Sequence, residues 1–308
     1  MSVLNGMPSK PLADAESPRP IAWNHIQAAL GTLRRPEGGY SLAQRGLITT
    51  GDGKILFVKV GVDEYTKGWA AKEIRAYDFL VENSYPYIPR LLSTNEDNTG
   101  FALDALCAED GWDWSDTWSK ERLDATLAAL DALAAIRPSS RYAELVAPVM
   151  TDENNGWPKL AASDELQANL AAKLAAVGET RLLPELQPHV ERSLNFNVRH
   201  DTLVHDDVRA DNCPWNGSQG IVKLVDWNWL ELGDRRIDLA AMLVHVQASG
   251  FDVIPNFKDR LNADALHWMA GFWFEAASKP IWPGGAEKLR EVQLRAGITA
   301  LKLAQTLS

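Results

Sequence analysis

The stretch LVHDDVRADNCPWNGSQGIVKLVDWNW, residues 203–229, restricts what this chain can fold into more than any other part of it. Its apolar runs, LVHDDV and GIVKLVDW, predict two short strands joined by a polar loop. The first strand and the loop contain His205-x-Asp207-x-x-x-x-Asn212, and the second strand ends at Asp226. Such a set is compatible with a solvated acidic hairpin, a metal cluster or a catalytic loop, so the flanking sequence has to decide.

Length and composition are those of a soluble globular protein. The chain has 308 residues, of which 46% are hydrophobic and 23% charged, which suffices for one large domain or two smaller ones. No apolar run approaches the roughly 18 residues that a membrane span needs, so we expect no membrane contact. An amino terminus without a hydrophobic segment and only two cysteines, Cys107 and Cys213, predict a reduced, cytoplasmic protein.

Charge is distributed unevenly along the chain. The net charge of −10 argues against non-specific nucleic-acid binding. Residues 1–105 carry 11 basic and 12 acidic side chains, whereas residues 106–308 carry 20 basic and 29 acidic ones. An acidic second half would suit a cationic small molecule. A merely solvated acidic surface explains the same balance, however, and is favoured on charge alone.

The first third of the chain predicts a small, mostly antiparallel sheet that carries helices. Residues 1–20 are rich in Pro and Ser and are expected to form a flexible N-terminus. Gly51-Asp52-Gly53 lies between two β-prone runs and is a hairpin signal. From the spacing of apolar residues we expect helices at 21–31 and 67–83, and strands at 38–50, 54–60, 88–94 and 100–106.

The remainder of the chain is mainly helical. Ala- and Leu-rich patterns with helical spacing occur at 121–136, 164–177, 261–278 and 286–307. This change of character near residues 104–110 predicts a β-rich lobe, 21–105, followed by a larger helical lobe, 106–308.

The order of the polar residues across these two lobes is that of a kinase-like phosphotransferase. Lys59 lies in the strand FVKV, Glu73 lies in the next helix, and the H-x-D-x-x-x-x-N loop and Asp226 follow. The segment VKLVDWNWLELGDRRIDLAAML resembles the aminoglycoside phosphotransferase family, whose relatives are choline and homoserine kinases. Protein kinases carry Asp-Phe-Gly where this chain has Asp-Trp. The resemblance extends over roughly residues 38–245.

The resemblance implies an α+β, bilobal, protein-kinase-like fold. Its small antiparallel sheet and one key helix would bind the nucleotide, and its helical lobe would hold the catalytic loop and the acceptor site. The implied reaction is the ATP- and Mg²⁺-dependent phosphorylation of a hydroxyl group on a small molecule. GTP remains open as the donor, and the state of assembly, monomer or homodimer, remains open as well.

Five residues of the opening stretch receive catalytic or metal-binding roles. Phosphoryl transfer through a loose transition state depends on positioning and charge neutralisation. Asp207 would accept a hydrogen bond from the acceptor hydroxyl, and the permanently charged Arg209 would face the γ-phosphate. His205 would brace the loop without titrating. Asn212 and Asp226 would offer hard oxygen ligands to Mg²⁺.

A strand lysine and a helix glutamate are the first candidates for nucleotide binding. Lys59 lies between two valines after a hydrophobic run, so its charge needs a partner if it is to be buried. Glu73 in the following helix is the expected partner, with Lys59 reaching the α- and β-phosphates. Glu64 is the competing acid, although it precedes the helical pattern. The alternative is a solvent-facing lysine on an edge strand.

The phosphate loop and the hinge are the remaining nucleotide-binding candidates. A GxGxxG motif is absent, and Gly38-Gly39-Tyr40-Ser41 occupies its place. Gly39 and Ser41 would let backbone amides approach phosphates, although a plain hairpin turn explains the same residues nearly as well. The hinge would be Leu103–Leu106, where the backbone of Asp104 and Leu106 would hydrogen-bond the adenine.

Asp206 departs from the family, which usually has glycine between the histidine and the catalytic aspartate. A second carboxylate there could help to attract an amine, or it could point to solvent. Adjacent residues on an extended backbone face opposite ways, so we expect Asp206 to be solvated. Asp238 resembles the buried aspartate that opens the next helix and accepts hydrogen bonds from loop amides.

Contacts to the acceptor are expected from the helical lobe. An amine-bearing acceptor, such as an aminoglycoside or an amino sugar, would fit aromatic walls and carboxylates. Acidity and aromatic character select Asp211, Trp229, Glu231, Trp273 and Glu275. Two other functions compete with this interpretation: a nucleotide-binding pseudokinase with a regulatory role, and a metal-dependent phosphohydrolase.

Overall fold

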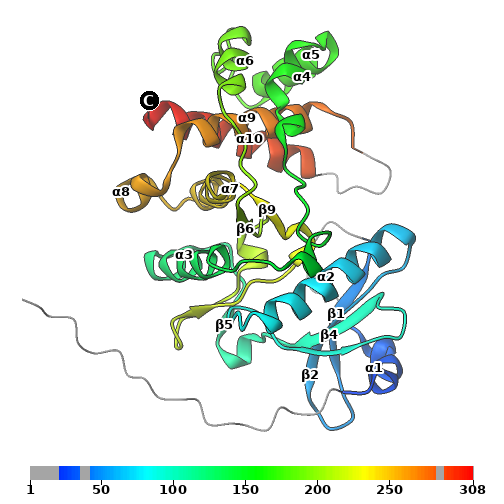
Figure 1. Ribbon diagram of the computed structural model, residues 1–308. Helices are drawn as coiled ribbons and strands as arrows, with labels where there is room; N and C mark the ends of the chain where they lie inside the picture. Colours follow the sequence, from blue (N-terminus) through cyan, green and yellow to red (C-terminus); the bar gives the residue numbers. More distant parts are fainter. Residues whose placement is uncertain (1–20, 35–41, 282–287, 308) are drawn as a thin grey trace, which may run out of the picture.

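The computed structural model describes residues 21–34, 42–281 and 288–307 (Figure 1). The expectations for residues 1–20 and for Gly39 and Ser41 lie outside these ranges. Figure 1 shows the sheet of the first lobe at one end of the molecule and the helices α4, α5, α6, α9 and α10 at the other. The segments that carry the catalytic motif lie between the two ends.

A four-stranded antiparallel sheet forms the first lobe. Its strand order is β1-β2-β4-β3, with β1 at Gln44–Thr49, β2 at Ile55–Val60, β3 at Leu91–Thr94 and β4 at Gly100–Asp104. Helix α1, Trp23–Ala29, continues into the 3₁₀ turn Leu30–Thr32, and α2 spans Glu64–Glu82. The predicted helices and strands of this region are therefore present, with strands shorter than the apolar runs because pairing ends at each turn.

Strand alternation determines the direction in which Lys59 points. Leu56 and Val58 of β2 belong to a small core with Ile26 of α1. Successive side chains of a strand face opposite sides of the sheet, so Phe57 and Lys59 face α2. Phe57 packs against the large core that includes the buried face of α2.

The start of α2 is fixed by a capping box. The Asp63 side chain accepts from the Thr66 amide, and the Thr66 hydroxyl accepts from the Asp63 amide. Glu64 is thus the first residue of the helix, which begins three residues earlier than the pattern predicts. Gly61 is needed just before this cap, because a Cβ there would overlap the backbone of Thr66 and Lys67.

The second lobe is built from helices around one large hydrophobic core. Gly156 and Gly271 allow α4 and α9 to cross closely, since a Cβ on Gly156 would overlap the Gly271 carbonyl. The helices are α3 (Lys120–Ala134), α4 (Gly156–Ala161), α5 (Asp164–Ala176), α6 (Gln187–Leu194), α7 (Arg235–Ala248), α8 (Ile254–Phe257), α9 (Ala263–Ser278) and α10 (Leu289–Leu307).

The strands of the catalytic stretch are shorter than the sequence predicts. The pairs are β6 (Thr202–Val204) with β9 (Glu231–Gly233), and β7 (Trp215–Asn216) with β5 (Trp112–Asp113) and β8 (Ile221–Val222). Asp206 and Asp226 adopt left-handed backbone with φ of 59° and 64°. A residue in that conformation cannot continue a strand, so both aspartates lie in loops.

The α+β class and the small antiparallel sheet are confirmed. The end of β4 at Asp104 lies where the sequence places the boundary between the lobes, but the exact division at 105 and 106 stays a prediction. Among the helices of the described residues, none is both long and apolar enough to cross a membrane.

Candidate active site

Lys59 lies at the centre of a buried charged triad. Its Nζ is 2.6 Å from Glu73 Oε2 and 2.9 Å from Asp226 Oδ1. Lys59 and Glu73 are 6% and 2% exposed, so the lysine is not a solvent-facing edge residue. The competing acid Glu64 lies at the exposed start of α2 and pairs with Lys67 at 3.3 Å. The predicted ion pair with Glu73 is therefore present, and Asp226 joins it.

The members of the triad shift one another's pKa values. Burial alone would lower the pKa of Lys59, but the carboxylates of Glu73 and Asp226 outweigh it and raise the pKa above its usual range. Burial raises the pKa of Glu73 to about 7, opposed by the Lys59 ammonium. For Asp226 burial is also the largest effect, but Lys59 and Arg209 together lower its pKa. Of the two carboxylates, Asp226 is therefore the one whose ionised form is stabilised.

Asp207 is held at its backbone and at both carboxylate oxygens. Asn212, at the end of the 3₁₀ turn Ala210–Asn212, donates from Nδ2 to the Asp207 carbonyl at 2.8 Å and to Oδ2 at 3.0 Å. Arg209 contacts the other oxygen, Oδ1. Burial raises the pKa of Asp207 to about 7; Arg209 opposes this, and the neighbouring Asp226 adds to it. An oriented carboxylate with such a pKa is suited to accept a proton near neutrality.

His205 connects the catalytic loop to the segment that carries Asp226. Its Nε2 lies 3.0 Å from the Val225 carbonyl, and its Nδ1 lies 3.3 Å from the Asp207 amide. Only a neutral ring with its proton on Nε2 can make both bonds. Burial lowers the pKa of His205, and the ring packs 4.4 Å from that of Trp227. This geometry is that of a brace, the role expected from the sequence.

Asn212 and Asp226 present oxygens that fit a hard divalent cation. The Asn212 amide nitrogen is used by Asp207, which directs its oxygen away from that contact. Lys59 and Asn228 both bond Oδ1 of Asp226, and among the described residues none bonds Oδ2. One amide oxygen and one carboxylate oxygen, completed by phosphate oxygens and water, are the usual protein share of a Mg²⁺ site beside a nucleotide.

A phosphohydrolase would need a richer ligand set. In residues 21–34, 42–281 and 288–307, no group of three or more His, Cys, Asp or Glu side chains could hold a metal ion. His205 is fully buried and uses both ring nitrogens within the protein. The described residues therefore give that alternative no support.

The expectation that Asp206 is solvated is wrong. Its backbone is left-handed rather than extended, so the side chain does not alternate with that of Asp207. Its Oδ2 is buried without a hydrogen-bond partner among the described residues, and the carboxyl lies within hydrogen-bonding reach of Glu231. Burial raises the pKa of Asp206 well above its usual range, and Glu231 and Asp238 add to the effect. The glycine usual at this position in the family suits the same left-handed backbone.

Asp234, rather than Asp238, opens the helix that follows. The Asp234 side chain accepts from the Arg236 amide, and α7 begins at Arg235. Asp238 lies inside the first turn and pairs with Arg235 at 2.7 Å. It also accepts from the Asp206 amide at 3.0 Å, as expected for a residue that satisfies loop amides.

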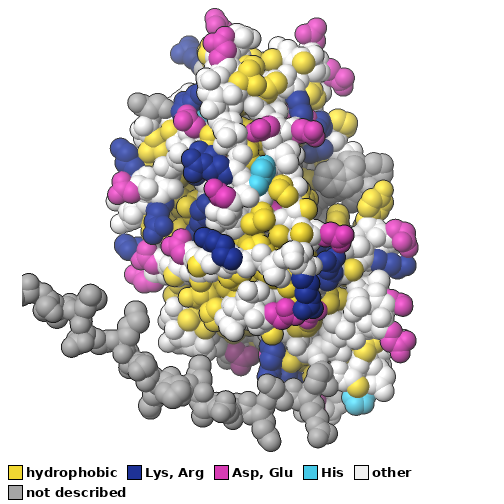
Figure 2. Space-filling view, in the orientation of Figure 1, with side chains coloured by type: hydrophobic (Ala, Val, Ile, Leu, Met, Phe, Trp, Pro, Cys, Tyr) yellow, Lys and Arg dark blue, Asp and Glu magenta, His cyan; other side chains and the backbone are white. Residues whose placement is uncertain are grey.

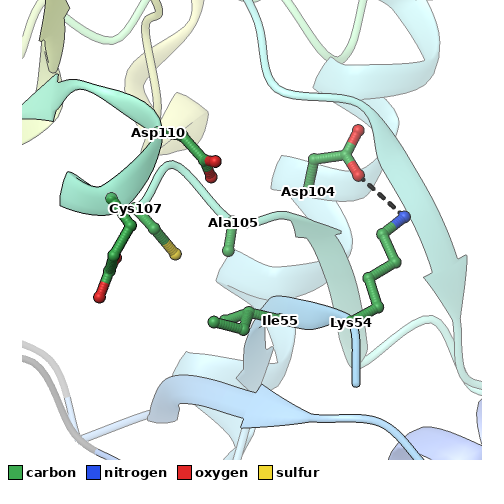
Figure 3. A pocket seen from close by; sticks show the side chains of 7 residues that line it. Lys54, Ile55, Asp104, Ala105, Cys107 and Asp110 are labelled. Atoms are coloured by element: carbon green, nitrogen blue, oxygen red, sulfur yellow. Dashed lines mark ion pairs between the residues drawn. The ribbon is translucent and has the colours of Figure 1, made fainter. Parts of the chain in front are cut away.

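The predicted hinge lines a cavity of about 410 Å³ (Figure 3). Asp104 and Ala105 lie on it, together with Cys107, which the sequence did not single out. Asp104 is paired with Lys54 at 3.1 Å and accepts from Arg90 at 3.0 Å. Leu106 is not among the residues that line this cavity, and its carbonyl accepts from the Trp114 indole at 2.7 Å.

The five expected acceptor contacts do not converge on one place. Asp211 is bound by the Arg209 guanidinium at 3.0 and 3.1 Å, and Trp229 is 45% exposed. Glu231 is fully buried, and its carboxylate accepts from the amides of Val149 and Met150. The assignment of Glu231 to the acceptor is therefore wrong: it anchors the 149–150 segment.

The other two expected contacts lie on α9. Glu275 has a side chain that is 10% exposed and pairs with Lys279 one turn later, which makes the pair local to this helix. Trp273 is buried and packs edge-on against His245 of α7 at 5.8 Å. Trp273 thus lies behind another side chain rather than at an open surface.

Sequence reasoning missed Arg122, a buried cation that positions the catalytic loop. Its guanidinium donates to the carbonyls of Cys213 at 2.9 Å and Ala210 at 3.2 Å. It also donates to the carbonyls of Ser115 and Thr117 at 2.8 and 2.7 Å. The helical pattern of α3 does not predict this role, because every partner of Arg122 is a backbone carbonyl, which any residue type provides.

The comparison with known families assigns the fold. A sequence model described as the phosphotransferase enzyme family matches residues 32–272. The chain belongs to this family. The family and the enzyme class expected from the sequence, a phosphotransferase of the aminoglycoside phosphotransferase type, are thereby confirmed.

Solved structures agree with this assignment at the level of fold. The choline kinase LicA from Streptococcus pneumoniae matches with a TM-score of 0.57 and 12% identity, covering 86% of this chain and 91% of that one. The structure of LicA in complex with AMP matches with a TM-score of 0.55 and 13% identity, covering 87% of this chain and 90% of that one. A putative aminoglycoside phosphotransferase from Ralstonia eutropha matches with a TM-score of 0.53 and 13% identity, covering 92% of this chain and 98% of that one. The bilobal, kinase-like fold is confirmed.

Proposed function

We propose that this phosphotransferase moves the γ-phosphoryl group of ATP, with Mg²⁺, to a hydroxyl group of a small molecule. The observation that carries the proposal is the buried triad of Lys59, Glu73 and Asp226 beside the Asp207–Asn212 loop. In this proposal Lys59 is the cation that binds the nucleotide, Asn212 and Asp226 supply the oxygen ligands, and Asp207 is the base. Complexes of related folds with nucleotide, such as LicA with AMP, support an adenine nucleotide as donor.

The proposed step is an in-line displacement. The acceptor oxygen forms a bond to the γ-phosphorus while the bond from that phosphorus to the β–γ bridging oxygen breaks, and ADP leaves. The acceptor proton passes to Asp207, whose carboxylate is aimed by Asn212. Mg²⁺, held by Asn212 and Asp226, would neutralise the phosphate charge. Lys59 would then exchange part of its contact with the carboxylates for the α- and β-phosphates.

Arg209 has a second task in this scheme. Its guanidinium bridges Asp207 and Asp211. A γ-phosphate carries more negative charge than a single carboxylate and is a stronger partner for a planar, permanently charged guanidinium. We infer that Arg209 turns from Asp207 to the phosphate when the nucleotide binds. That movement frees the Oδ1 oxygen of Asp207 for the acceptor hydroxyl.

The competing function, a pseudokinase, has no specific observation in its favour. Such proteins bind nucleotide without turnover because a base or a metal ligand is missing. Here Asp207, Asn212 and Asp226 are all present and oriented. The cavity at the hinge does not distinguish ATP from GTP. Its wall beyond the hinge carries the acidic residues Glu109 and Asp110.

Nucleotide binding measured by calorimetry tests the proposal. Wild-type protein should bind ATP more tightly with Mg²⁺ than with EDTA. Asp226→Asn should remove most of that difference, and Lys59→Met should weaken binding in both conditions. Lys67→Met, which replaces a lysine that is 43% exposed, is the matched control and should bind as the wild type does. ATP affinity that is unaffected by Mg²⁺ and by both site variants would refute the proposal.

A further inference from the structure

A second cavity of about 400 Å³ lies between α7 and α10. Its polar lining consists of His245 of α7, Ser249 just after α7, Lys288 just before α10, and Glu291 and Arg295 in the first turns of α10. This volume is in the range of small-molecule sites. No element of the nucleotide site described above contributes to it.

His245 lies on α7 two helical turns after Asp238, on the same side of the helix, and Asp238 bonds the amide of Asp206 in the catalytic loop. The pKa of His245 is lowered to about 4, chiefly by burial and also by the charge of Arg209, whereas Asp211 opposes the shift. The lowered pKa keeps the imidazole neutral at physiological pH. A neutral ring offers one donor and one acceptor to a polar ligand.

The ring nitrogens of His245 have no hydrogen-bond partner among the described residues, although the ring is largely buried. Trp273 packs against the ring at 5.8 Å with an interplanar angle of 74°. An oriented, neutral and uncommitted imidazole on a cavity wall is a group that a hydroxylated ligand can use.

The charge of this cavity is opposite to that of the chain. The protein has a net charge of −10, yet the cavity has two cations and one carboxylate. Within residues 21–34, 42–281 and 288–307, neither Lys288 nor Arg295 has an ion-pair partner. Glu291, one helical turn before Arg295, can neutralise one of the two cations at most. On the face shown in Figure 2, basic and acidic side chains are interspersed rather than gathered into one acidic surface.

We propose that this cavity receives the acceptor and that the acceptor carries a carboxylate in addition to its hydroxyl groups. Arg295 and Lys288 would bind the carboxylate, and His245 would bind a hydroxyl on the side that faces the catalytic loop. The inference rests on the function proposed above. It replaces the cationic acceptor expected from the charge balance, for which Glu231 and Glu275 are not available because both are engaged within the protein.

Matched pairs of compounds test the charge of the acceptor. D-Glycerate, D-gluconate and D-glucuronate are compared with glycerol, D-glucitol and D-glucose, and with the cations kanamycin, D-glucosamine and choline. Release of ADP is measured with each compound. We expect at least one acid to be phosphorylated with a kcat/KM about 10-fold or more above that of its neutral partner. Phosphorylation of the cations alone would overturn the inference and leave the proposed function intact.

Arg295 is the residue whose replacement separates binding from chemistry. Arg295→Gln should raise the KM for the acid about 10- to 100-fold and should change kcat much less, because a charge-assisted bond is lost from binding. Arg295→Lys should recover part of the affinity. Arg181→Gln, which replaces another exposed arginine of the same lobe, is the matched control and should change neither constant. Equal KM values for Arg295→Gln and wild type would overturn the proposed role.

Thermal-shift titrations keep the two proposals distinguishable if no compound is phosphorylated. If the acids stabilise the wild type but not Arg295→Gln, the anion site stands, and the proposed function fails only if ATP binding is also unaffected by Mg²⁺ and by the site variants. If no acid stabilises the wild type while the neutral and cationic compounds are also without effect, the anion site is refuted.

Discussion

Replacing Asp206 by asparagine should stabilise this protein by an amount that grows with pH. The wild-type carboxyl is buried in left-handed backbone beside the Glu231 carboxylate, and its pKa is raised well above the usual range, chiefly by burial. Between the usual pKa and the raised one, the unfolded chain therefore carries an ionised Asp206, whereas the folded protein holds a proton on it. Asparagine has almost the same shape, tolerates left-handed backbone and can donate its amide to Glu231 without a titrating proton.

The magnitude follows from proton linkage. Between the unfolded pKa of Asp206, 3.8, and its raised folded pKa, the folded state binds one proton more than the unfolded state. The free energy of unfolding of the wild type then falls by about 1.4 kcal/mol for each pH unit of increase. This loss is absent in Asp206→Asn. The difference between variant and wild type should be small near pH 4 and should grow by about 1.4 kcal/mol per pH unit above it, until the pH passes the folded pKa.

Urea denaturation followed by tryptophan fluorescence measures this difference at pH 4, 5, 6, 7 and 8. Other carboxyls, such as Glu73, titrate in both proteins and cancel in the comparison. Asp206→Ala is the companion variant: it also lacks the carboxyl and should show the same slope, with a smaller gain at each pH because no amide bonds Glu231. A stability difference between Asp206→Asn and wild type that is constant across this pH range would refute the buried, protonated carboxyl.

Three further predictions concern packing and the catalytic loop. Gly156→Ala should lower the free energy of unfolding by about 1–3 kcal/mol or more, because the new methyl group would overlap the Gly271 carbonyl. In the same urea denaturation assay the control Gly51→Ala should change stability little, because there is open space around Gly51. Arg122→Leu should lower the free energy of unfolding by about 3 kcal/mol, because four backbone carbonyls lose a buried charged donor. It should also lower turnover, because the catalytic loop loses its anchor; unchanged stability would contradict this role. Asn212→Ala should lower kcat about 100-fold and raise the Mg²⁺ concentration needed for half-maximal turnover, and an unchanged Mg²⁺ requirement would remove Asn212 from the ligand set.

Local patterns predicted the part of the site that depends on periodicity. Alternation along β2 and helical spacing along α2 place Lys59 and Glu73 on facing surfaces, and the structure joins them at 2.6 Å. The spacing from His205 to Asn212 likewise predicted a loop whose members bond one another. In these cases the residues in contact belong to one element or to two elements that follow each other in the sequence.

Contacts that depend on backbone conformation or on distant carbonyls could not be predicted. The direction of Asp206 was predicted from an extended strand, but a left-handed residue turns its side chain toward Glu231 instead. Glu231 was taken for an acceptor contact, because nothing in the sequence shows that it bonds the amides of residues 149 and 150. Arg122 was overlooked for the same reason. The acceptor side therefore had to be inferred from the structure.

The central claim is that Asp207 is the base of a phosphoryl transfer to a small-molecule hydroxyl. The direct test is ³¹P NMR of ATP and Mg²⁺ with the acceptor panel above, comparing wild type with Asp207→Asn and with the surface control Asp124→Asn, whose wild-type side chain is 50% exposed. The wild type and the control should form ADP and a new phosphomonoester at equal rates. Asp207→Asn should bind ATP normally but form the ester at least about 100-fold more slowly. An Asp207→Asn variant that forms the ester at the wild-type rate would contradict the account.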